Sequence, residues 1–155
     1  SKKGHQPLIE QKQKGRERVT LFGAVNPISG EVIVQKSEKG NAKTFKKYLK
    51  KLIKHYKNKA GKIHLILDNV RYHHAKLLKP FLERNAKKLE LVFLPAYSPD
   101  LNPMERVWWY MRKKISHNRY IKTLKERMGE FWKMFSGYQK PNDFIVNLCN
   151  ISFSV

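Results

Sequence analysis

Two acidic side chains in this sequence stand where they could bind a metal ion. Asp68 directly follows the apolar run Ile63–Leu67, which is typical of a strand buried in a sheet. The carboxyl end of such a strand faces the ligand crevice of an open α/β sheet, although Asp-Asn after a strand is also ordinary turn chemistry. Glu105 belongs to Asn-Pro-Met-Glu (102–105), which by itself predicts only a helix start with Asn102 as N-cap in a capping box.

These two acids would meet if the strand that precedes the second one, Leu89–Leu94, pairs with Ile63–Leu67. Asp68 and Glu105 would then lie at the same edge of the sheet. Hard oxygen ligands placed close together in a basic protein are what Mg²⁺ or Mn²⁺ requires for phosphoryl transfer. The spacing therefore indicates phosphoryl-transfer chemistry on a polyanion.

The charge balance also indicates a polyanionic partner. The chain has 33 Lys and Arg against 12 Asp and Glu, a formal charge of +21, and nucleic acid is the leading candidate. Residues 41–62 contain nine lysines and no acid, and residues 106–127 contain eight cations and one acid. A solvated helix face is the alternative, but such faces normally mix signs to gain i,i+4 pairs. We expect phosphate contacts from Lys46, Lys47, Lys50, Lys54, Arg112, Lys113 and Lys114, and a DNA contact from the loop aromatic Tyr97.

The composition excludes several classes of protein. A chain of 155 residues fits one domain, and 41% hydrophobic with 12% aromatic residues argues against disorder. One cysteine excludes an internal disulfide framework and a Cys-rich zinc module, and indicates a reducing compartment such as the cytoplasm. No apolar run reaches the roughly 20 residues that a membrane span needs, so no membrane partner is expected. No P-loop, G-x-G-x-x-G or Ser-His-Asp pattern supports a nucleotide cofactor or acyl transfer.

The elements that must position the two acids follow from hydrophobic periodicity and turn residues. A hairpin, a helix capped by Asn41 and ended by Gly61, and a parallel strand pair joined by a helical crossover are expected, with Pro80 kinking or splitting the crossover. The first eighteen residues read as an irregular lead-in or an edge segment. The predicted strands are 19–25, 31–35, 63–67 and 89–94, and the predicted helices are 42–56, 74–86, 103–116, 121–135 and a short one within 141–155. The class is α/β.

Two motifs resemble those of a known family. LILDN (65–69) and LPAYSPDLNPMERVW (94–108) are similar to the catalytic core of DDE transposases of the mariner superfamily, in its bacterial and archaeal insertion-sequence branch. The resemblance includes FGAVNPISGEV (22–32) and weakens beyond about Tyr120. It implies an RNase-H-like mixed sheet with flanking helices. Residues 1–155 would form one N-terminally incomplete catalytic domain, with a helical C-terminal extension from about residue 121.

The resemblance also implies a chemistry. Two Mg²⁺ or Mn²⁺ ions would be held by three carboxylates, with Asp68 matching the second acid and Glu105 the third. Asp100 would shape the motif loop, and Trp108 would pack in the core. No aspartate precedes Asp68, and the earlier glutamates match no motif of the family, so we expect the first strand and its acid to be missing and this chain alone to be inactive.

The implied activity is cleavage of DNA at transposon ends and joining of the freed 3′ hydroxyl to target DNA. The partners would be double-stranded DNA and a second copy of the chain in a homodimer. The implied location is the prokaryotic cytoplasm, with nucleoid association when DNA is bound. Two alternatives remain open, a non-catalytic DNA-binding remnant of a transposase and a structure-selective nuclease of the same fold.

Several other residues could have a functional role, but a structural or solvated role is the simpler interpretation. His73 and His74 are expected to be solvated rather than catalytic, and Cys149 to be a small buried hydrophobe. Four aromatic residues have helical spacing and are expected in the core rather than as base-stacking platforms: Trp108, Trp109, Phe131 and Trp132.

Overall fold

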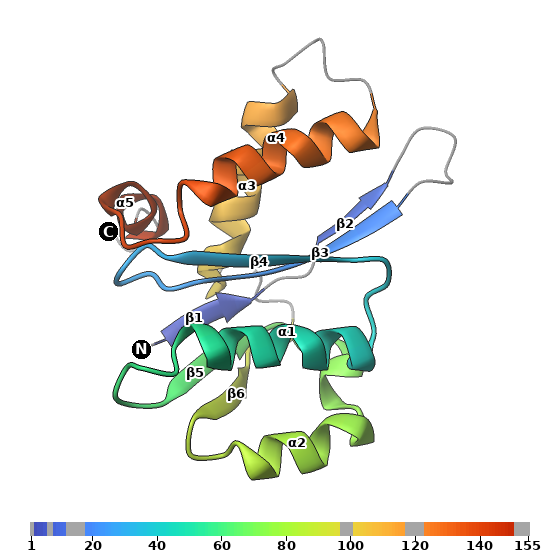
Figure 1. The fold of residues 1–155 in the computed structure, drawn as a ribbon, viewed down its shortest axis with the longest axis vertical. Helices are drawn as coiled ribbons and strands as arrows, with labels where there is room; N and C mark the ends of the chain where they lie inside the picture. The colour runs from blue at the N-terminus through green and yellow to red at the C-terminus, as the bar shows by residue number, and fades with distance from the viewer. Residues whose placement is uncertain (1, 6–7, 12–17, 97–100, 117–122, 151–155) are drawn as a thin grey trace.

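The computed structural model describes residues 2–5, 8–11, 18–96, 101–116 and 123–150 (Figure 1). Its strands are β1 (Lys2–His5), β2 (Leu8–Gln11), β3 (Arg18–Val25), β4 (Val32–Ser37), β5 (Ile63–Leu67) and β6 (Leu89–Phe93). Its α-helices are α1 (Ala42–His55), α2 (Lys79–Arg84), α3 (Pro103–Ser116), α4 (Leu124–Ser136) and α5 (Asp143–Asn150), and two 3₁₀ turns, η2 (Arg71–His74) and η3 (Lys76–Leu78), precede α2. None of the helices in these ranges is long and apolar enough to cross a membrane.

The strands form one mixed sheet in the order β2-β3-β1-β5-β6, with β4 on the other side of β3. β3 and β4 pair antiparallel from Thr20↔Ser37 to Val25↔Val32, which confirms the predicted hairpin. β5 and β6 pair parallel from Ile63↔Leu89 to Leu67↔Phe93, which confirms the predicted crossover unit. The α/β class and the mixed sheet with flanking helices are therefore as expected.

The expected absence of a first strand is wrong in one respect. β1 lies between β3 and β5, antiparallel to the first and parallel to the second, so a strand fills that central position of the sheet. β2 continues along β3. The polar composition of residues 2–5 suggested an irregular lead-in, but strand pairing depends on backbone hydrogen bonds, which any residue except proline supplies. The sequence of β1 is Lys-Lys-Gly-His, so this strand brings no acid.

Helices cover both faces of the sheet and create two hydrophobic cores (Figure 1). On β3, Leu21 belongs to the core under α3, whereas Phe22 belongs to the core under α1. Gly23 faces α3 so closely that a Cβ at this position would lie 2.6 Å from the Trp108 ring. The alternation of β3 side chains therefore places α1 and α3 on opposite faces of one sheet.

Helix α1 begins where the sequence predicts. The Asn41 side chain accepts a hydrogen bond from the Thr44 N–H at 2.9 Å, and Thr44 Oγ1 accepts one from the Asn41 N–H at 3.0 Å. This reciprocal pair satisfies two N–H groups that the first turn of a helix leaves without partners. The helix ends at His55, earlier than predicted, and Gly61, with φ of +97°, forms the turn that leads into β5.

The crossover from β5 to β6 differs from the predicted helix over 74–86. It consists of η2, η3 and the short α2, and Pro80 lies in the first turn of α2 rather than at a kink. Proline fits there because the N–H groups of the first turn need no helical partner. The apolar composition of residues 89–94 is typical of a strand that is buried on both faces, but β6 is an edge strand with Val92 38% exposed.

Candidate active site

The loop after β5 is held by contacts to the main chain of Asp68. The Asp68 carbonyl oxygen accepts a hydrogen bond from the Val70 N–H at 2.9 Å and one from His73 Nδ1 at 3.0 Å. His73 is buried, at 1% exposure, and its ring lies 4.4 Å from the Phe45 ring of α1. Packing between α1 and η2 therefore fixes the position of the loop that carries the Asp68 carboxylate.

The start of α3 is joined to the same carboxylate through Asn102. Asn102 Oδ1 accepts a hydrogen bond from the Met104 N–H at 3.0 Å, and its carbonyl accepts one from the Glu105 N–H at 3.0 Å. The Asn102 side chain also forms a hydrogen bond with the Asp68 carboxylate. Asn102 is 1% exposed, so one buried amide both caps the helix and links the two motifs.

Asp68 and Glu105 lie at the same end of the sheet and repel each other. Burial raises the pKa of the Asp68 carboxyl, although the hydrogen bond from Asn102 opposes this. Burial raises the pKa of the Glu105 carboxyl, the negative charge of Asp68 raises it further, and the Arg112 guanidinium opposes both. The charge of Asp68 acts on Glu105, so the expectation that the two acids share a metal site stays a prediction in which a bound cation would relieve their mutual repulsion.

The site has two carboxylates, and carboxylate oxygens are the kind of ligand that a divalent ion such as Mg²⁺ binds. Within the described ranges, no group of three or more His, Cys, Asp or Glu side chains converges on one point. Asp100, in the motif loop, lies outside the described residues. Two carboxylate oxygens are suitable ligands for Mg²⁺ or Mn²⁺, which in proteins keep several waters.

The chain is similar to several known proteins. A family model described as DDE superfamily endonuclease matches residues 1–127. The chain belongs to this family. It is 29% identical over 108 residues to the "Insertion element IS630 uncharacterized 39 kDa protein" of Shigella sonnei, covering 70% of this chain and 31% of that protein. It is 41% identical over 58 residues to "Uncharacterized protein y4pE/y4sA" of Sinorhizobium fredii (strain NBRC 101917 / NGR234), covering 37% of this chain and 39% of that protein. The chain thus spans 31% and 39% of the length of these two curated relatives.

Solved structures share the fold. The catalytic domain of Mos1 mariner transposase has a TM-score of 0.72 at 17% identity, covering 96% of this chain and 75% of that chain. The HTLV-2 integrase catalytic core domain, solved in complex with magnesium, has a TM-score of 0.53 at 11% identity, covering 84% of this chain and 82% of that chain. Other Mos1 structures contain Mn or a left transposon end. The fold of this DDE superfamily endonuclease is therefore that of RNase-H-like transposase and integrase catalytic domains.

The two histidines of this DDE superfamily endonuclease do not form a solvated pair. Burial lowers the pKa of His73 to about 4, with the hydrogen bond to Asp68 opposing the shift, so the ring is neutral at pH 7. Only His74 is exposed, and it stacks on Phe93 at 4.0 Å and contacts the Asn69 side chain. The sequence did not reveal the burial of His73, because its neighbour Phe45 comes from a distant helix.

The aromatic residues divide between core and surface. Trp108 and Phe131 are buried, and Trp132 packs on Phe135, as predicted. Trp109 is 55% exposed, so its expected place in the core is wrong. It follows Glu105 by four residues on α3 and therefore lies on the same face of the helix, with Lys113 Nζ 4.9 Å from its ring.

The expected DNA-binding residues fall on two different surfaces. Lys47, Lys50 and Lys54 are exposed on α1, whereas Lys46 is half-buried with its Nζ 5.7 Å from the Phe81 ring. The cations Arg112, Lys113 and Lys114 are exposed on α3, on the opposite face of the sheet (Figure 1). Tyr97 lies outside the described residues. Cys149 is buried, as predicted.

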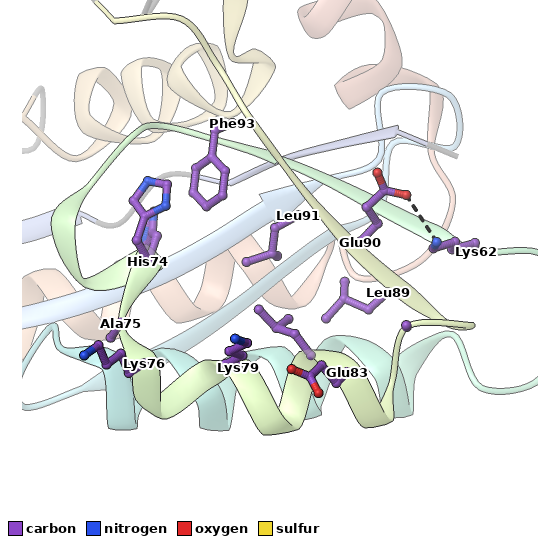
Figure 2. Close-up of a pocket in the computed structure, with 13 residues that line it drawn as sticks. Lys62, His74, Ala75, Lys76, Lys79, Glu83, Leu89, Glu90, Leu91 and Phe93 are labelled. Atoms are coloured by element: carbon purple, nitrogen blue, oxygen red, sulfur yellow. Dashed lines mark ion pairs between the residues drawn. The ribbon is translucent and has the colours of Figure 1, made fainter.

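A cavity of about 560 Å³ runs between the edge strand β6 and α2. Figure 2 shows His74 and Phe93 at one end of it and the Lys62–Glu90 ion pair, 3.2 Å long, at the other. Neither Asp68 nor Glu105 lines this cavity. The carboxylate site and the cavity are therefore separate features that share only the loop after β5.

Proposed function

We propose that this chain is the catalytic domain of a metal-dependent DNA transposase, which cleaves DNA strands at transposon ends and joins the freed 3′ hydroxyl to target DNA. The observation that carries the proposal is the placement of Asp68 directly after β5 and of Glu105 in the first turn of α3, which the buried Asn102 caps. The raised pKa values of both carboxyls agree with it. The formal charge of +21 suits double-stranded DNA as the substrate. Similar structures that contain transposon DNA, Mn or magnesium support the same assignment.

Each residue of the site would have a distinct task. Asp68 and Glu105 would hold the divalent ions, two in a complete site. Bound ions stabilise the negative charge that develops on a phosphate and activate the attacking oxygen. Asn102 orients the Asp68 carboxylate, and His73 fixes the main chain that carries it. Both are positioning residues.

We further propose that residues 1–155 act as one domain whose C-terminal extension is the α4–α5 segment. In support, α4 and α5 share a hydrophobic core with α3 and the β3–β4 hairpin. Phosphates would be held by lysines of α1 and by the α3 cations, largely without reading sequence. Tyr97 would contact DNA from the motif loop. We expect the protein to act as a homodimer, because two transposon ends must be processed together.

A second function is favoured by one observation, the sequence of β1. The strand beside β5 is Lys-Lys-Gly-His and carries no acid. Two carboxylates leave a metal pair with excess positive charge, and Mg²⁺ gives up its waters reluctantly for so few ligands. A non-catalytic DNA-binding remnant of a transposase is therefore the alternative.

A nicking assay with Mn²⁺ on labelled duplex distinguishes the two. We expect no cleavage by this 155-residue chain, and cleavage by a version extended upstream with an Asp-bearing strand that takes the place of β1 beside β5. Asp68→Asn in the extended version should abolish that cleavage while duplex binding persists. Cleavage by the short chain that Asp68→Asn removes would mean that another acid, such as Glu10 or Glu17, completes the site. An inactive extended version would support the non-catalytic alternative.

A further inference from the structure

The strand β6 has one edge that no other described strand covers. Within the described ranges it is the last strand of the sheet and pairs only with β5. The Lys88 carbonyl oxygen accepts a hydrogen bond from β5 at 2.8 Å, and the Leu94 N–H donates one to β5 at 2.9 Å, so the even-numbered residues of this segment face β5. Because alternate residues of a parallel strand bond to opposite sides, the N–H and C=O groups of Leu91 and Phe93 point to the free edge.

The same strand forms one wall of the cavity of about 560 Å³. Its contribution is apolar and consists of Leu89, Leu91 and Phe93, together with Glu90. The facing wall comes from α2 and the turn after it, in the i, i+3, i+4, i+7 pattern of one helix face: Lys79, Leu82, Glu83 and Ala86. Figure 2 shows these side chains between β6 and α2. Free backbone groups beside an apolar cavity suit an extended segment, because main-chain hydrogen bonds give affinity and the cavity accepts alternate side chains.

β6 lacks the features that usually protect an edge strand. Proteins commonly protect such strands with lysine, proline or a bulge. The sequence of β6 is Leu-Glu-Leu-Val-Phe, and its pairing with β5 runs without a bulge. Its one charged residue, Glu90, lies 3.2 Å from Lys62 in an ion pair. The strand is therefore open to pairing with another backbone.

The charges around the cavity favour an acidic occupant. Lys76 and Lys79 line it and take part in no ion pair within the part of the chain that the structure describes. Of the two acids in the lining, Glu90 pairs with Lys62, so Glu83 alone offsets these two lysines. The formal charge of +21 also attracts acidic segments and repels a second copy of the chain.

We propose that the free edge of β6 and the cavity beside it bind an extended acidic peptide segment of a partner protein. The segment adds a strand to the sheet and directs apolar side chains into the cavity. Five residues are enough to follow β6 over its length, roughly 17 Å at 3.3 Å per residue. Neither Asp68 nor Glu105 lines the cavity, so the inference does not depend on the proposed function.

A synthetic peptide tests this inference. The probe is fluorescein-Glu-Val-Thr-Val-Thr-Val-Glu-amide, and fluorescence anisotropy with the 155-residue chain measures its dissociation constant. Two analogues, N-methylated at the valines or at the threonines, keep the charge and the side chains but block opposite edges of the added strand. We expect one analogue to bind about tenfold more weakly and the other to bind like the parent, because only one edge faces β6. No binding of the parent peptide, or equal affinities of the two analogues, overturns the inference.

A matched pair of variants locates the site on the protein. Ala86→Trp places a large side chain at the cavity and should weaken peptide binding about tenfold. Ala60→Trp, at an exposed position outside the lining, should leave binding unchanged. Equal affinities of the two variants overturn the inference. Light scattering of the chain alone tests the other occupant, since a dimer that Ala86→Trp dissociates would assign the edge to a second copy and overturn the proposed partner.

The charge of the occupant is tested with a second pair. Lys76→Gln/Lys79→Gln should weaken binding of the acidic peptide about threefold to tenfold, because exposed ion pairs contribute modestly. Lys47→Gln/Lys50→Gln removes the same charge from exposed positions of α1 and should have little effect. Equal losses in both variants would assign binding to the overall charge of the chain and overturn the inference.

Discussion

The chain has buried or half-buried carboxylates at opposite ends of its sheet, and their pKa values are shifted in opposite directions. Glu31 lies beside the end of α1, where the chain turns toward the start of β5, whereas Asp68 follows the end of β5. Burial alone would raise the pKa of Glu31, but hydrogen bonds from His55 and Ser29 and the charge of Lys59 outweigh burial and lower it. The pKa values of Asp68 and Glu105 are raised instead. The protein thus neutralises one carboxylate internally and leaves the other two to repel each other.

The partners explain the difference. Glu31 accepts a hydrogen bond from Ser29 Oγ at 2.8 Å, lies 2.9 Å from His55 Nε2, and lies 3.6 Å from Lys59 Nζ. At the other end, a neutral amide contacts Asp68, and the Arg112 charge only partly opposes the shift in Glu105. A carboxylate whose partners belong to the chain serves stability. A repelling pair is a site that an external cation would stabilise.

The largest expected effect is the loss of stability on removing the Glu31 charge. Glu31→Gln leaves His55 and Lys59 beside a neutral amide, so we expect the free energy of unfolding to fall by about 2 kcal/mol, the range for hydrogen bonds to charged groups. Urea unfolding at pH 7 measures this change. Glu38→Gln, at an exposed position, should change stability little. Equal stability changes for both substitutions would show that the Glu31 charge has no special role in stability.

The next effect concerns binding at the carboxylate end. Trp109→Ala should weaken duplex or single-strand binding by about 1–2 kcal/mol, roughly tenfold, because an exposed ring on the Glu105 face of α3 can stack on a base or sugar. The free energy of unfolding should be nearly unchanged, since the side chain is 55% exposed. Ile28→Ala is the matched control, because Ile28 is 72% exposed on the β3–β4 hairpin, at the Glu31 end. Equal losses of DNA affinity would mean that the two ends do not differ in binding.

Acidification should erase the contribution of Glu31. Because its folded pKa is lower than the ordinary value of 4.5, the stability it supplies is complete above that value and is lost as the pH falls through the folded pKa. The difference in stability between the wild type and Glu31→Gln should therefore shrink below pH 4.5. A difference that stays constant down to pH 3 would show that hydrogen-bond geometry, rather than charge, accounts for the effect.

The smallest effect has the opposite sign. The pKa of the Asp68 carboxyl is raised in the folded chain, so its negative charge destabilises the fold at neutral pH and ceases to do so once the carboxyl is protonated. Asp68→Asn removes this charge and therefore the repulsion. We expect a gain of less than about 1 kcal/mol at pH 7, since the site keeps contact with solvent. Thermal unfolding with and without Mn²⁺ measures it. A loss of stability would make Asp68 a structural carboxylate like Glu31.

Much of the fold could be predicted because its signals are local. The bounds of β5 follow from an apolar run that only His64 interrupts, and the start of α3 follows from Asn102 and Pro103. Asp68 and Glu105 were identifiable for the same reason, since each is positioned by the end of its own element. β1 escaped prediction because its pairing with β3 and β5 uses the backbone and leaves no hydrophobic pattern in residues 2–5.

The sequence by itself determined most of the elements, the charge and the two candidate acids, because caps, turns and periodicity act over a few residues. Only the tertiary structure decided what surrounds each side chain. Glu31 meets His55 across 24 positions of sequence, and His73 is buried against Phe45 of another element. Trp109 is exposed and Trp108 buried although they are adjacent, because only Trp108 faces Gly23 of β3. Burial and pKa depend on groups that the fold brings together from distant segments, and a local sequence pattern does not reveal these neighbours.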